Sequence, residues 1–348
     1  MAPRRPSPLP PAALKAARAQ CGLLAAWQLG SVGVSRDRIR RLVRAGELVQ
    51  VARGVYDVVG LRPPGGDAGA DRERERTARL GVLAHGPTAV AAGHSALTLW
   101  GVHGVPRTFR PEIVLRGGGA VAGPTLVRVR REPVTRYVHR RGVPCLLPEV
   151  ALAQAVGEVD RLTAVALMDS ARHQRILTDR AFARARELAR HRRGAARSRR
   201  WWDESEPRAE SPAETWARLR CADAGVPPDR LQPAVYDASG RFLARVDLAW
   251  YLGAGAWLLG EVDGANWHGT RKAVVADMHR QNAIVTSATV LRRWTGTQAG
   301  NGSLVSDVRP LLTRAGWRPG RACPDRVVVP DRIPSGFVAP SAASRDEP

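Results

Sequence analysis

Hydrophobic and polar positions at the start of the chain follow the period of an α-helix. Apolar residues recur every three or four positions over residues 12–20 and, more briefly, over residues 24–29. A third helix is expected to begin after Ser35, whose hydroxyl can accept a free backbone N–H of the first turn, and to end at Gly46. The pattern therefore predicts three consecutive helices.

Two short segments of β character follow these helices. They cover residues 48–51 and 54–58 and are joined around Arg53. Three helices followed by a β-hairpin are the element order of a winged helix-turn-helix, which we predict for residues 1–60.

The third helix of this domain is rich in arginine. Its apolar residues Ile39, Leu42 and Val43 fall on one face, so the arginines occupy the remaining surface. A recognition helix enters the major groove of DNA and needs cationic or polar residues on its outer face. An ordinary helical subdomain with a solvated arginine face is the alternative. The candidate DNA-binding residues are Ser35, Arg36, Arg38, Arg40, Arg41, Arg44 and, at the tip of the hairpin, Arg53.

The middle of the chain combines a linker, a small domain and a helical segment. Residues 61–75 are rich in Pro, Gly and charge and are expected to connect two domains. Residues 76–150 mix helical and alternating segments, which predicts a small α/β module. Residues 151–205 are helical by period and form a basic connector. No metal-ligand spacing is shared by the histidines of the module, His94, His103 and His139.

The basic connector has two interpretations. Between Arg172 and Arg200 it contains eleven arginines against only two acidic residues, Asp179 and Glu187. These arginines form either a solvated face on a connecting helix pair or a rail that contacts phosphates.

The last third of the chain alternates between apolar strands and helices. We predict an α/β domain over residues 206–320 and a flexible tail, rich in Pro and Ser, over residues 321–348. The expected elements are a helix capped by Ser211, strands over residues 231–236, 242–251, 256–262 and 289–294, and helices over residues 271–287 and 304–315.

Two of these strands carry three carboxylates. Asp247 lies inside an apolar strand, Glu261 ends the next one and Asp263 follows two residues later. Period-2 geometry puts Glu261 and Asp263 on the same side, and Asp247 can face them if the strands are neighbours. Burying three carboxylates is costly unless a cation neutralises them, and hard oxygen ligands suit Mg²⁺ or Mn²⁺. Such an ion can polarise a phosphodiester and lower the pKa of an attacking water. The three residues are therefore candidate metal ligands and catalytic residues.

Two further residues lie just beyond the carboxylates. His268 can shuttle a proton near neutral pH, and Lys272, one of two lysines in the chain, can contact phosphate.

Composition narrows the class of function. The net charge of +22 favours a polyanionic partner, and nucleic acid is the usual one. The four cysteines are far apart, which indicates reduced thiols instead of disulfides or a zinc cluster. No apolar run approaches the ~20 residues of a membrane helix and no signal peptide is legible, so we expect a cytoplasmic protein without a membrane partner.

The carboxylates belong to a longer pattern. Val246-Asp247-Leu248 and the run GEVDGANWHG over residues 260–269 resemble the very-short-patch-repair endonuclease-like family of the restriction-endonuclease superfamily. Asp277, Arg280 and residues 290–292 and 210–214 add to this resemblance, which covers about 105 residues. It implies a C-terminal α/β/α domain with a mixed central sheet and a metal-dependent DNA endonuclease activity.

Carried over to this sequence, the resemblance implies that Asp247 and Glu261 hold the metal. Asp263 stands where the superfamily often has Lys; it is then a further ligand, and His268 or Lys272 compensates. Alternatively, the domain only binds DNA. The resemblance also implies that Glu214 is a helix-borne acidic partner of the site.

The N-terminal part resembles another family. Gly33-Val34-Ser35, Arg53-Gly54-Val55-Tyr56 and, further on, His94-Ser95-Ala96-Leu97 are similar to the winged-helix antitoxins of type IV toxin–antitoxin systems of the abortive-infection kind. Two-part chains that join such a domain to an endonuclease-like one occur among actinobacterial proteins.

Three functions compete. The leading hypothesis is a Mg²⁺-dependent DNA endonuclease, a phosphodiester hydrolase, targeted by its winged helix. The second is a non-enzymatic, antitoxin-like transcriptional regulator with a degenerate nuclease domain, for which a cognate toxin is an expected partner and a homodimer a possible form. The third is a structural or RNA-binding role of the basic helices alone.

Overall fold

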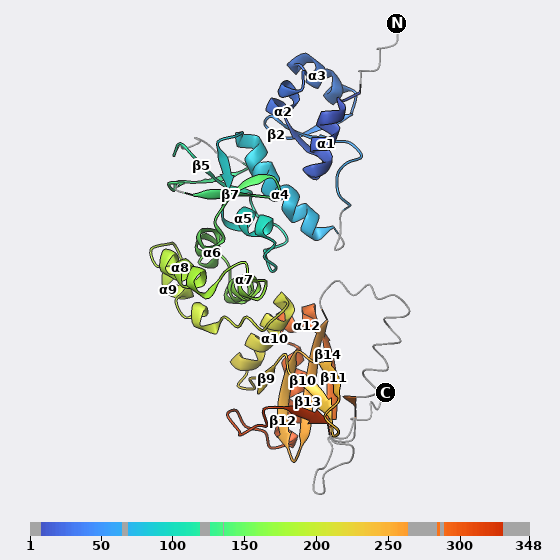
Figure 1. The fold of residues 1–348 in the computed structure, drawn as a ribbon, viewed down its shortest axis with the longest axis vertical. Helices are drawn as coiled ribbons and strands as arrows, with labels where there is room; N and C mark the ends of the chain where they lie inside the picture. Colours follow the sequence, from blue (N-terminus) through green and yellow to red (C-terminus); the bar gives the residue numbers. More distant parts are fainter. Residues whose placement is uncertain are drawn as a thin grey trace, which may run out of the picture. The chain divides into compact units, whose positions relative to one another are not determined.

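The computed structural model describes residues 8–64, 69–118, 126–134, 136–263, 284–285 and 289–329. The chain divides into two compact units, residues 1–204 and residues 205–348 (Figure 1). Both mix helices with strands, so the predicted α/β class is confirmed. The finer division into five segments stays a prediction. Within the described residues, no helix is both long and apolar enough to cross a membrane.

Unit 1 begins with a winged helix-turn-helix. Its strands form a three-stranded sheet in the order β1-β3-β2, and its helices bury a small apolar core that includes Ile39 and Leu42. The elements are α1 (Pro11–Ala19), β1 (Leu23–Ala25), α2 (Ala26–Ser31), α3 (Arg36–Arg44), β2 (Leu48–Ala52) and β3 (Val55–Val58).

The strand β1 corrects the sequence prediction of a helix over residues 24–29. Leu23, Leu24 and Ala25 pair with β3 and are all buried, so they extend the hairpin sheet by one strand. The chain enters β1 through Gly22, whose φ of +86° is easily adopted only by glycine. The second helix therefore starts only at Ala26.

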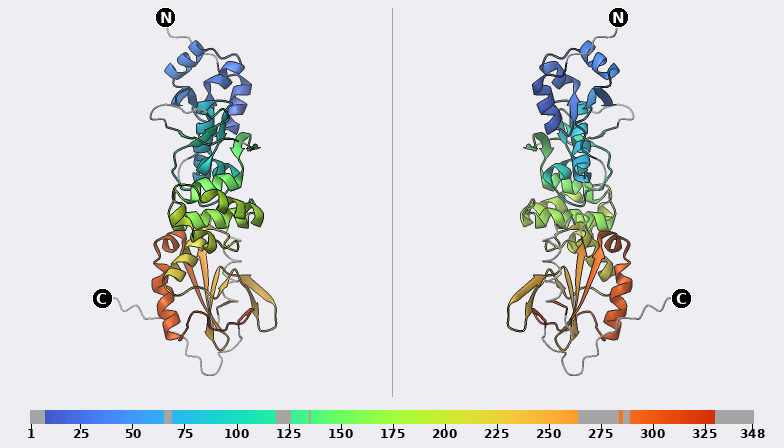
Figure 2. Two further views of the ribbon diagram at one scale, coloured as in Figure 1. Left: turned by 90° about the vertical axis from the view of Figure 1, so that its left-hand side faces the viewer. Right: turned by 90° about the vertical axis from the view of Figure 1, so that its right-hand side faces the viewer.

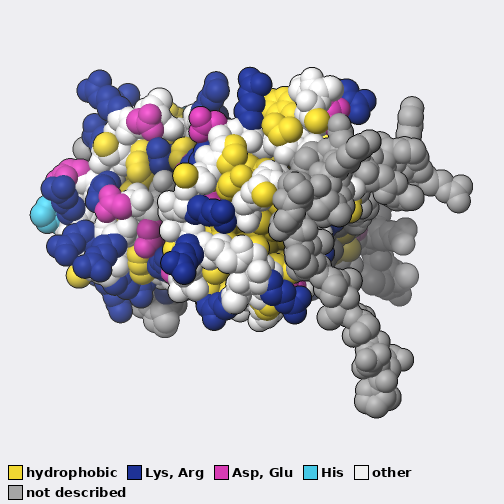
Figure 3. Space-filling view, turned by 90° about the horizontal axis from the view of Figure 1, so that it is seen from below, with side chains coloured by type: hydrophobic (Ala, Val, Ile, Leu, Met, Phe, Trp, Pro, Cys, Tyr) yellow, Lys and Arg dark blue, Asp and Glu magenta, His cyan; other side chains and the backbone are white. Residues whose placement is uncertain are grey.

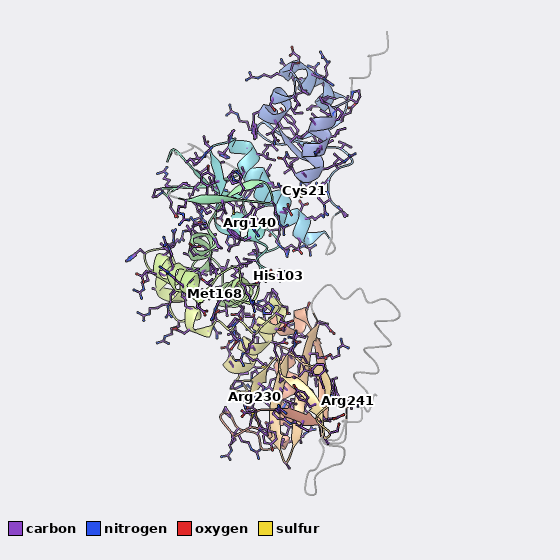
Figure 4. The ribbon with its side chains drawn as sticks, in the orientation of Figure 1. Cys21, His103, Arg140, Met168, Arg230 and Arg241 are labelled. Atoms are coloured by element: carbon purple, nitrogen blue, oxygen red, sulfur yellow. The ribbon has the colours of Figure 1, made fainter. Side chains whose placement is uncertain are left out.

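A five-stranded mixed sheet follows, in the order β6-β5-β4-β8-β7, and α4 and α5 pack against it. Arg140 of its edge strand lies over the Trp100 ring at the end of α5, 4.4 Å from the ring centre (Figure 4). The elements are α4 (Ala70–His85), β4 (Ala89–Ala91), α5 (Gly93–Trp100), β5 (Glu112–Leu115), β6 (Arg128–Arg130), β7 (Tyr137–Arg140) and β8 (Val143–Leu146).

Helices complete unit 1. Two of them are capped by side chains: Asp160 accepts from Thr163 N at 3.0 Å, and Thr178 accepts from Ala181 N at 3.2 Å. The backbone N–H of His103 donates to the Ser170 hydroxyl, on the helix formed by residues 161–173, at 2.7 Å. The elements are α6 (Pro148–Val156), α7 (Arg161–His173), α8 (Asp179–Ala189), α9 (Ala195–Ser198) and η1 (Trp201–Glu204).

Unit 2 has a helical layer and two sheets. The central sheet is mixed, in the order β14-β13-β12-β9, with β13 and β14 parallel and the other pairs antiparallel. Figure 2 shows α13 lying along this sheet. The elements are α10 (Pro212–Asp223), β9 (Arg230–Leu231), β10 (Ala234–Asp237), β11 (Phe242–Arg245), β12 (Leu248–Gly253), β13 (Ala256–Asp263), β14 (Thr289–Thr295), α12 (Gly296–Asn301), α13 (Leu304–Arg314) and β15 (Val327–Val329).

The two faces of the central sheet bury different partners. Leu248, Leu258 and Trp294 pack with α10, α12 and α13. Trp257 and Leu259, on the opposite face, pack against the second sheet, whose order is β11-β10-β15. This alternation along β13 follows from the period-2 geometry of a strand.

The predicted single strand over residues 242–251 is divided at Val246 and Asp247. Before them, β11 pairs with β10 of the second sheet; after them, β12 pairs with β13 of the central sheet. Asp247 therefore stands where the chain passes from one sheet to the other. The helix predicted over residues 271–287 lies outside the described residues, apart from Ile284 and Val285.

Candidate nucleic-acid interface and acidic site

Helix α3 presents arginines to solvent on one face and apolar residues to the core on the other. Ser35 caps it by accepting from Arg38 N at 3.2 Å, and Ile39 and Leu42 are buried. At 100° per residue, the exposed arginines fall on the opposite side of the helix. They are Arg36, Arg40, Arg41 and Arg44.

Two of the arginines on α3 have partners within the domain. Arg40 forms an ion pair with Asp37 on the exposed face. Arg38 is half-buried, and its Nη2 donates to the carbonyl of Pro8 at 2.6 Å. Arg38 thus holds the segment that precedes α1, a role that the sequence did not suggest. Arg36, Arg41 and Arg44 have no ion pair within the described residues.

The hairpin formed by β2 and β3 adds an exposed cation outside α3. Arg53 lies in its two-residue turn, before Gly54, whose φ is +70°. A cation at the tip of a wing can reach a phosphate or the minor groove when the adjacent helix lies in the major groove.

The acidic site of unit 2 begins with Glu214 on α10. Its carboxylate accepts from Glu210 N at 2.9 Å and from Gln232 Nε2 at 2.8 Å, and the residue is only 8% exposed. Its own backbone N–H is capped by Ser211 Oγ at 3.3 Å. The first turn of α10 therefore aims a buried carboxylate at the chain between β9 and β10.

Asp247 is the centre of the site. Its Oδ1 accepts from Gln232 Nε2 at 2.8 Å, and its Oδ2 accepts from the backbone N–H of Val262 at 2.7 Å. Burial raises the pKa of Asp247 to about 7, and the neighbouring Glu214 and Glu261 carboxylates add to the rise, while the two hydrogen bonds oppose it. Asp247 is thus a carboxyl that changes protonation near neutral pH.

Arg293 on β14 forms ion pairs with the other two predicted carboxylates. It is paired with Glu261 in the parallel register of β13 and β14. Its Nε lies 3.3 Å from Glu261 Oε2, and its Nη2 lies 2.8 Å from Asp263 Oδ1. Glu261 and Asp263 therefore share one side of β13. Glu261 is 8% exposed. It pairs with Arg293, and its charge raises the pKa of Asp247, whereas Asp263 ends the strand beside Arg293.

The donor set fits a divalent cation in chemistry and charge. Glu214, Asp247 and Glu261 offer only hard oxygen ligands, and burial, together with the charges of Glu214 and Glu261, raises the pKa of Asp247. Their spacing fits less well, because within the described residues the ligand atoms of these three do not all lie within 4.8 Å of one another. The Gln232 amide stands between two of them instead.

A different trio, in unit 1, does meet that distance. His94, Glu112 and Glu158 have ligand atoms within 4.8 Å. Arg130 occupies this cluster, however, with ion pairs to both carboxylates, and His94 Nδ1 lies 2.7 Å from Glu112. The two glutamates are already neutralised by Arg130 and by Arg128, which pairs with Glu158, so no cation is needed there.

The sequence missed two residues of the acidic site. Gln232 links Glu214 to Asp247, and Arg293 links Glu261 to Asp263. The one sequence signal for Arg293 was its place inside an apolar strand, because buried charges in a sheet are usually paired. His268 and Lys272, the other predicted members, lie outside the described residues.

Comparison with known proteins supports the N-terminal part. No curated protein matches the chain. Residues 14–59 match the family described as transcriptional regulator, AbiEi antitoxin. The matched segment runs from α1 through β3. The winged helix of this protein is therefore similar to that of the AbiEi antitoxin regulators, as the sequence predicted for this part, while the endonuclease-like resemblance of unit 2 stays a prediction.

Proposed function

We propose that this protein is a DNA-binding transcriptional regulator of the antitoxin type, which docks α3 in the major groove of duplex DNA. The observation that carries this proposal is the exposed face of Arg36, Arg40, Arg41 and Arg44 on the capped third helix of a winged helix-turn-helix. The match of residues 14–59 to a family of regulators supports it.

The chemistry of α3 suits both parts of DNA recognition. Arginine can bind guanine in a bidentate manner in the major groove or contact phosphates. Asp37, on the same face, can accept a hydrogen bond from cytosine when it is not held by Arg40. Because Ile39 and Leu42 are buried in the core, they fix the orientation of the helix, and its charged side chains face solvent.

Binding of fluorescent duplex DNA tests the proposal. An Arg36/Arg41/Arg44→Gln variant should lose most of the affinity of the wild type. A control variant, Arg72/Arg314/Arg318→Gln, removes the same charge from exposed arginines outside the winged helix and should lose far less. Equal losses in both variants would show that net charge, and not the recognition face, governs binding.

An antitoxin also needs a toxin, so we propose a cognate toxin as a protein partner, and a homodimer as the form that reads a two-fold symmetric operator. Co-purification with the product of an adjacent gene tests the first, and light scattering of the purified protein tests the second. A monomer in solution and on operator DNA would exclude the dimer.

A second candidate function belongs to unit 2. We propose that Glu214, Asp247 and Glu261 hold Mg²⁺ or Mn²⁺ in a DNA-cleaving site; the single observation that favours it is the buried Asp247 between two other carboxylates. When bound, the ion would polarise a phosphodiester and supply a more acidic water. Within the protein, Gln232 and Val262 orient Asp247, and Arg293 orients Glu261.

Cleavage of supercoiled plasmid with Mg²⁺, with Mn²⁺ and with chelator tests this site. Asp247→Asn and Glu261→Gln should abolish nicking, while Asp223→Asn, an exposed carboxylate on the same helix as Glu214, should retain it. Cleavage that survives in folded Asp247→Asn protein would exclude the site. If the wild type does not cleave DNA, the regulator is the only function that stands.

A further inference from the structure

Only some of the arginines in the helices at the end of unit 1 have partners within the protein. Eleven arginines lie between Arg172 and Arg200. Five of them have protein partners. Arg172 pairs with Asp179, Arg186 with Asp203, Arg190 with Glu187 and Arg192 with Glu132, and Arg197 donates to the carbonyls of Gly157 and Val159.

The other six arginines are exposed and have no ion pair within the described residues. We call them the α8–α9 basic surface: Arg175, Arg180, Arg184, Arg193, Arg199 and Arg200. Figure 3 shows Lys and Arg side chains exposed at many places on the face that it presents.

Holding these charges together is unfavourable in the absence of a partner. Arg180 and Arg184 stand four residues apart on the face of α8 opposite the buried Ala185 and Ala189. Like charges at this spacing destabilise a helix, and the two acidic residues of α8, Asp179 and Glu187, are paired with Arg172 and Arg190. An anion would relieve this repulsion.

The surroundings of these arginines favour nucleic acid over a protein partner. Protein interfaces are built around an apolar, often aromatic core. Among the described residues, none of the exposed large hydrophobic side chains lies between residues 172 and 200. Contacts to a phosphate backbone need no such core, because arginine binds phosphate oxygens directly.

We propose that the α8–α9 basic surface binds the phosphate backbone of duplex DNA without reading its sequence, as a second contact besides α3. This inference rests on the proposed DNA-binding function. Neutralised phosphates release counterions, so each contact adds about 0.9 to the magnitude of the slope of log affinity against log salt concentration.

The test is the salt dependence of full-length protein binding to a mixed-sequence DNA duplex, followed by fluorescence anisotropy. An Arg180/Arg184/Arg193→Gln variant should lower the magnitude of the slope by about 2 to 3 relative to the wild type. The Arg72/Arg314/Arg318→Gln control, with the same net charge, should change it by less than about 1. Glutamine keeps a high helix propensity, and circular dichroism checks that α8 stays folded.

The outcomes separate this inference from the proposed function. A wild type that binds no DNA overturns both. DNA binding that depends on α3 but has the same slope in the Arg180/Arg184/Arg193→Gln variant overturns only the basic surface. A duplex RNA of the same length that shows the slope change when the DNA does not would assign the surface to RNA and also overturn the proposal.

Discussion

The side-chain amide of Gln232 lies between two buried carboxylates, with its Nε2 2.8 Å from both Glu214 and Asp247. The backbone N–H of Gln232 also donates to the Asp247 carbonyl at 2.9 Å. These bonds hold Gln232 at a φ of +53°, a left-handed conformation that costs a non-glycine residue about 1 kcal/mol or more. The Gln232 amide thus separates two acidic groups and donates a hydrogen bond to each of them.

Replacing Gln232 should therefore change the charge balance of the site. Gln232→Leu removes the shared donor and should destabilise unit 2 by about 1–3 kcal/mol at pH 8, where Asp247 is ionised. Gln232→Glu adds a further negative charge directly beside Glu214 and Asp247 and should cost more. If the site takes a divalent cation, Mg²⁺ should restore the stability of Gln232→Glu and not that of Gln232→Leu. Urea unfolding with and without Mg²⁺ measures both effects, and equal responses would contradict this account of the amide.

The pKa of Asp247 predicts how stability varies with pH. Its folded-state pKa of about 7 is above the ordinary aspartate value of 3.8, so the native state binds the proton more tightly than the unfolded state does. Stability from this group is complete below about pH 4 and is lost as the pH rises through 7. Each pKa unit corresponds to about 1.4 kcal/mol, so the loss can reach about 4 kcal/mol.

Asp247→Asn separates this effect from all other titrations. The difference in unfolding free energy between the wild type and Asp247→Asn should shift in favour of the variant between pH 4 and pH 7 and then stay constant. Asp223→Asn, an exposed carboxylate, should show no such shift. A difference that is independent of pH would mean that Asp247 is ionised throughout.

Local patterns predicted the winged helix well and the acidic site less completely. Ser35, Gly46 and the arginine face of α3 lie within a few residues of one another, so capping and helical period were sufficient. The strand β1 was missed because Leu23–Ala25 becomes a strand only by pairing with Val55–Asp57, a distant segment of the chain.

The same limit applies to unit 2. The sequence could place Glu261 and Asp263 on one side of a strand, because that follows from the period of two. It could not find Arg293 or Gln232, since both reach the site through contacts between distant segments. Nor could it show that Asp247 stands at a change of sheet, because the pairing of β11 and β12 with different neighbours is a tertiary property.

A buried ion pair joins the winged helix to the rest of unit 1, and it predicts an unequal response to two arginine substitutions. Arg76 on α4 donates to both carboxylate oxygens of Asp57 on β3, at 3.0 and 2.8 Å, and to the carbonyl of Cys21 at 2.8 Å. Arg76→Ala leaves Asp57 buried without its charge partner and should destabilise unit 1 by about 3–5 kcal/mol. Arg62→Ala removes an exposed pair with Glu73 and should cost about 1 kcal/mol or less.

Denaturant unfolding of the two variants measures the difference. A double variant, Arg76→Met with Asp57→Leu, removes both charges and should recover much of the stability lost in Arg76→Ala, because no unpaired charge stays buried. Similar losses for Arg62→Ala and Arg76→Ala would show that the Asp57 pair is not the link between the two parts.

The positions of Arg41 and Arg53 predict different roles in DNA recognition. Arg41 lies on the exposed face of α3, where a side chain can reach base edges, whereas Arg53 lies at the tip of the β2–β3 hairpin, where a phosphate is the nearest target. Selection of bound sequences from a randomised duplex pool should yield a motif with the wild type. Arg41→Ala should relax one position of that motif, at a cost of about 1–3 kcal/mol for the preferred base. Arg53→Ala should leave the motif intact, weaken binding to all sequences and lower the salt slope by about 1. If Arg53→Ala changed the motif while Arg41→Ala left it intact, the hairpin and not α3 would be the element that reads the sequence.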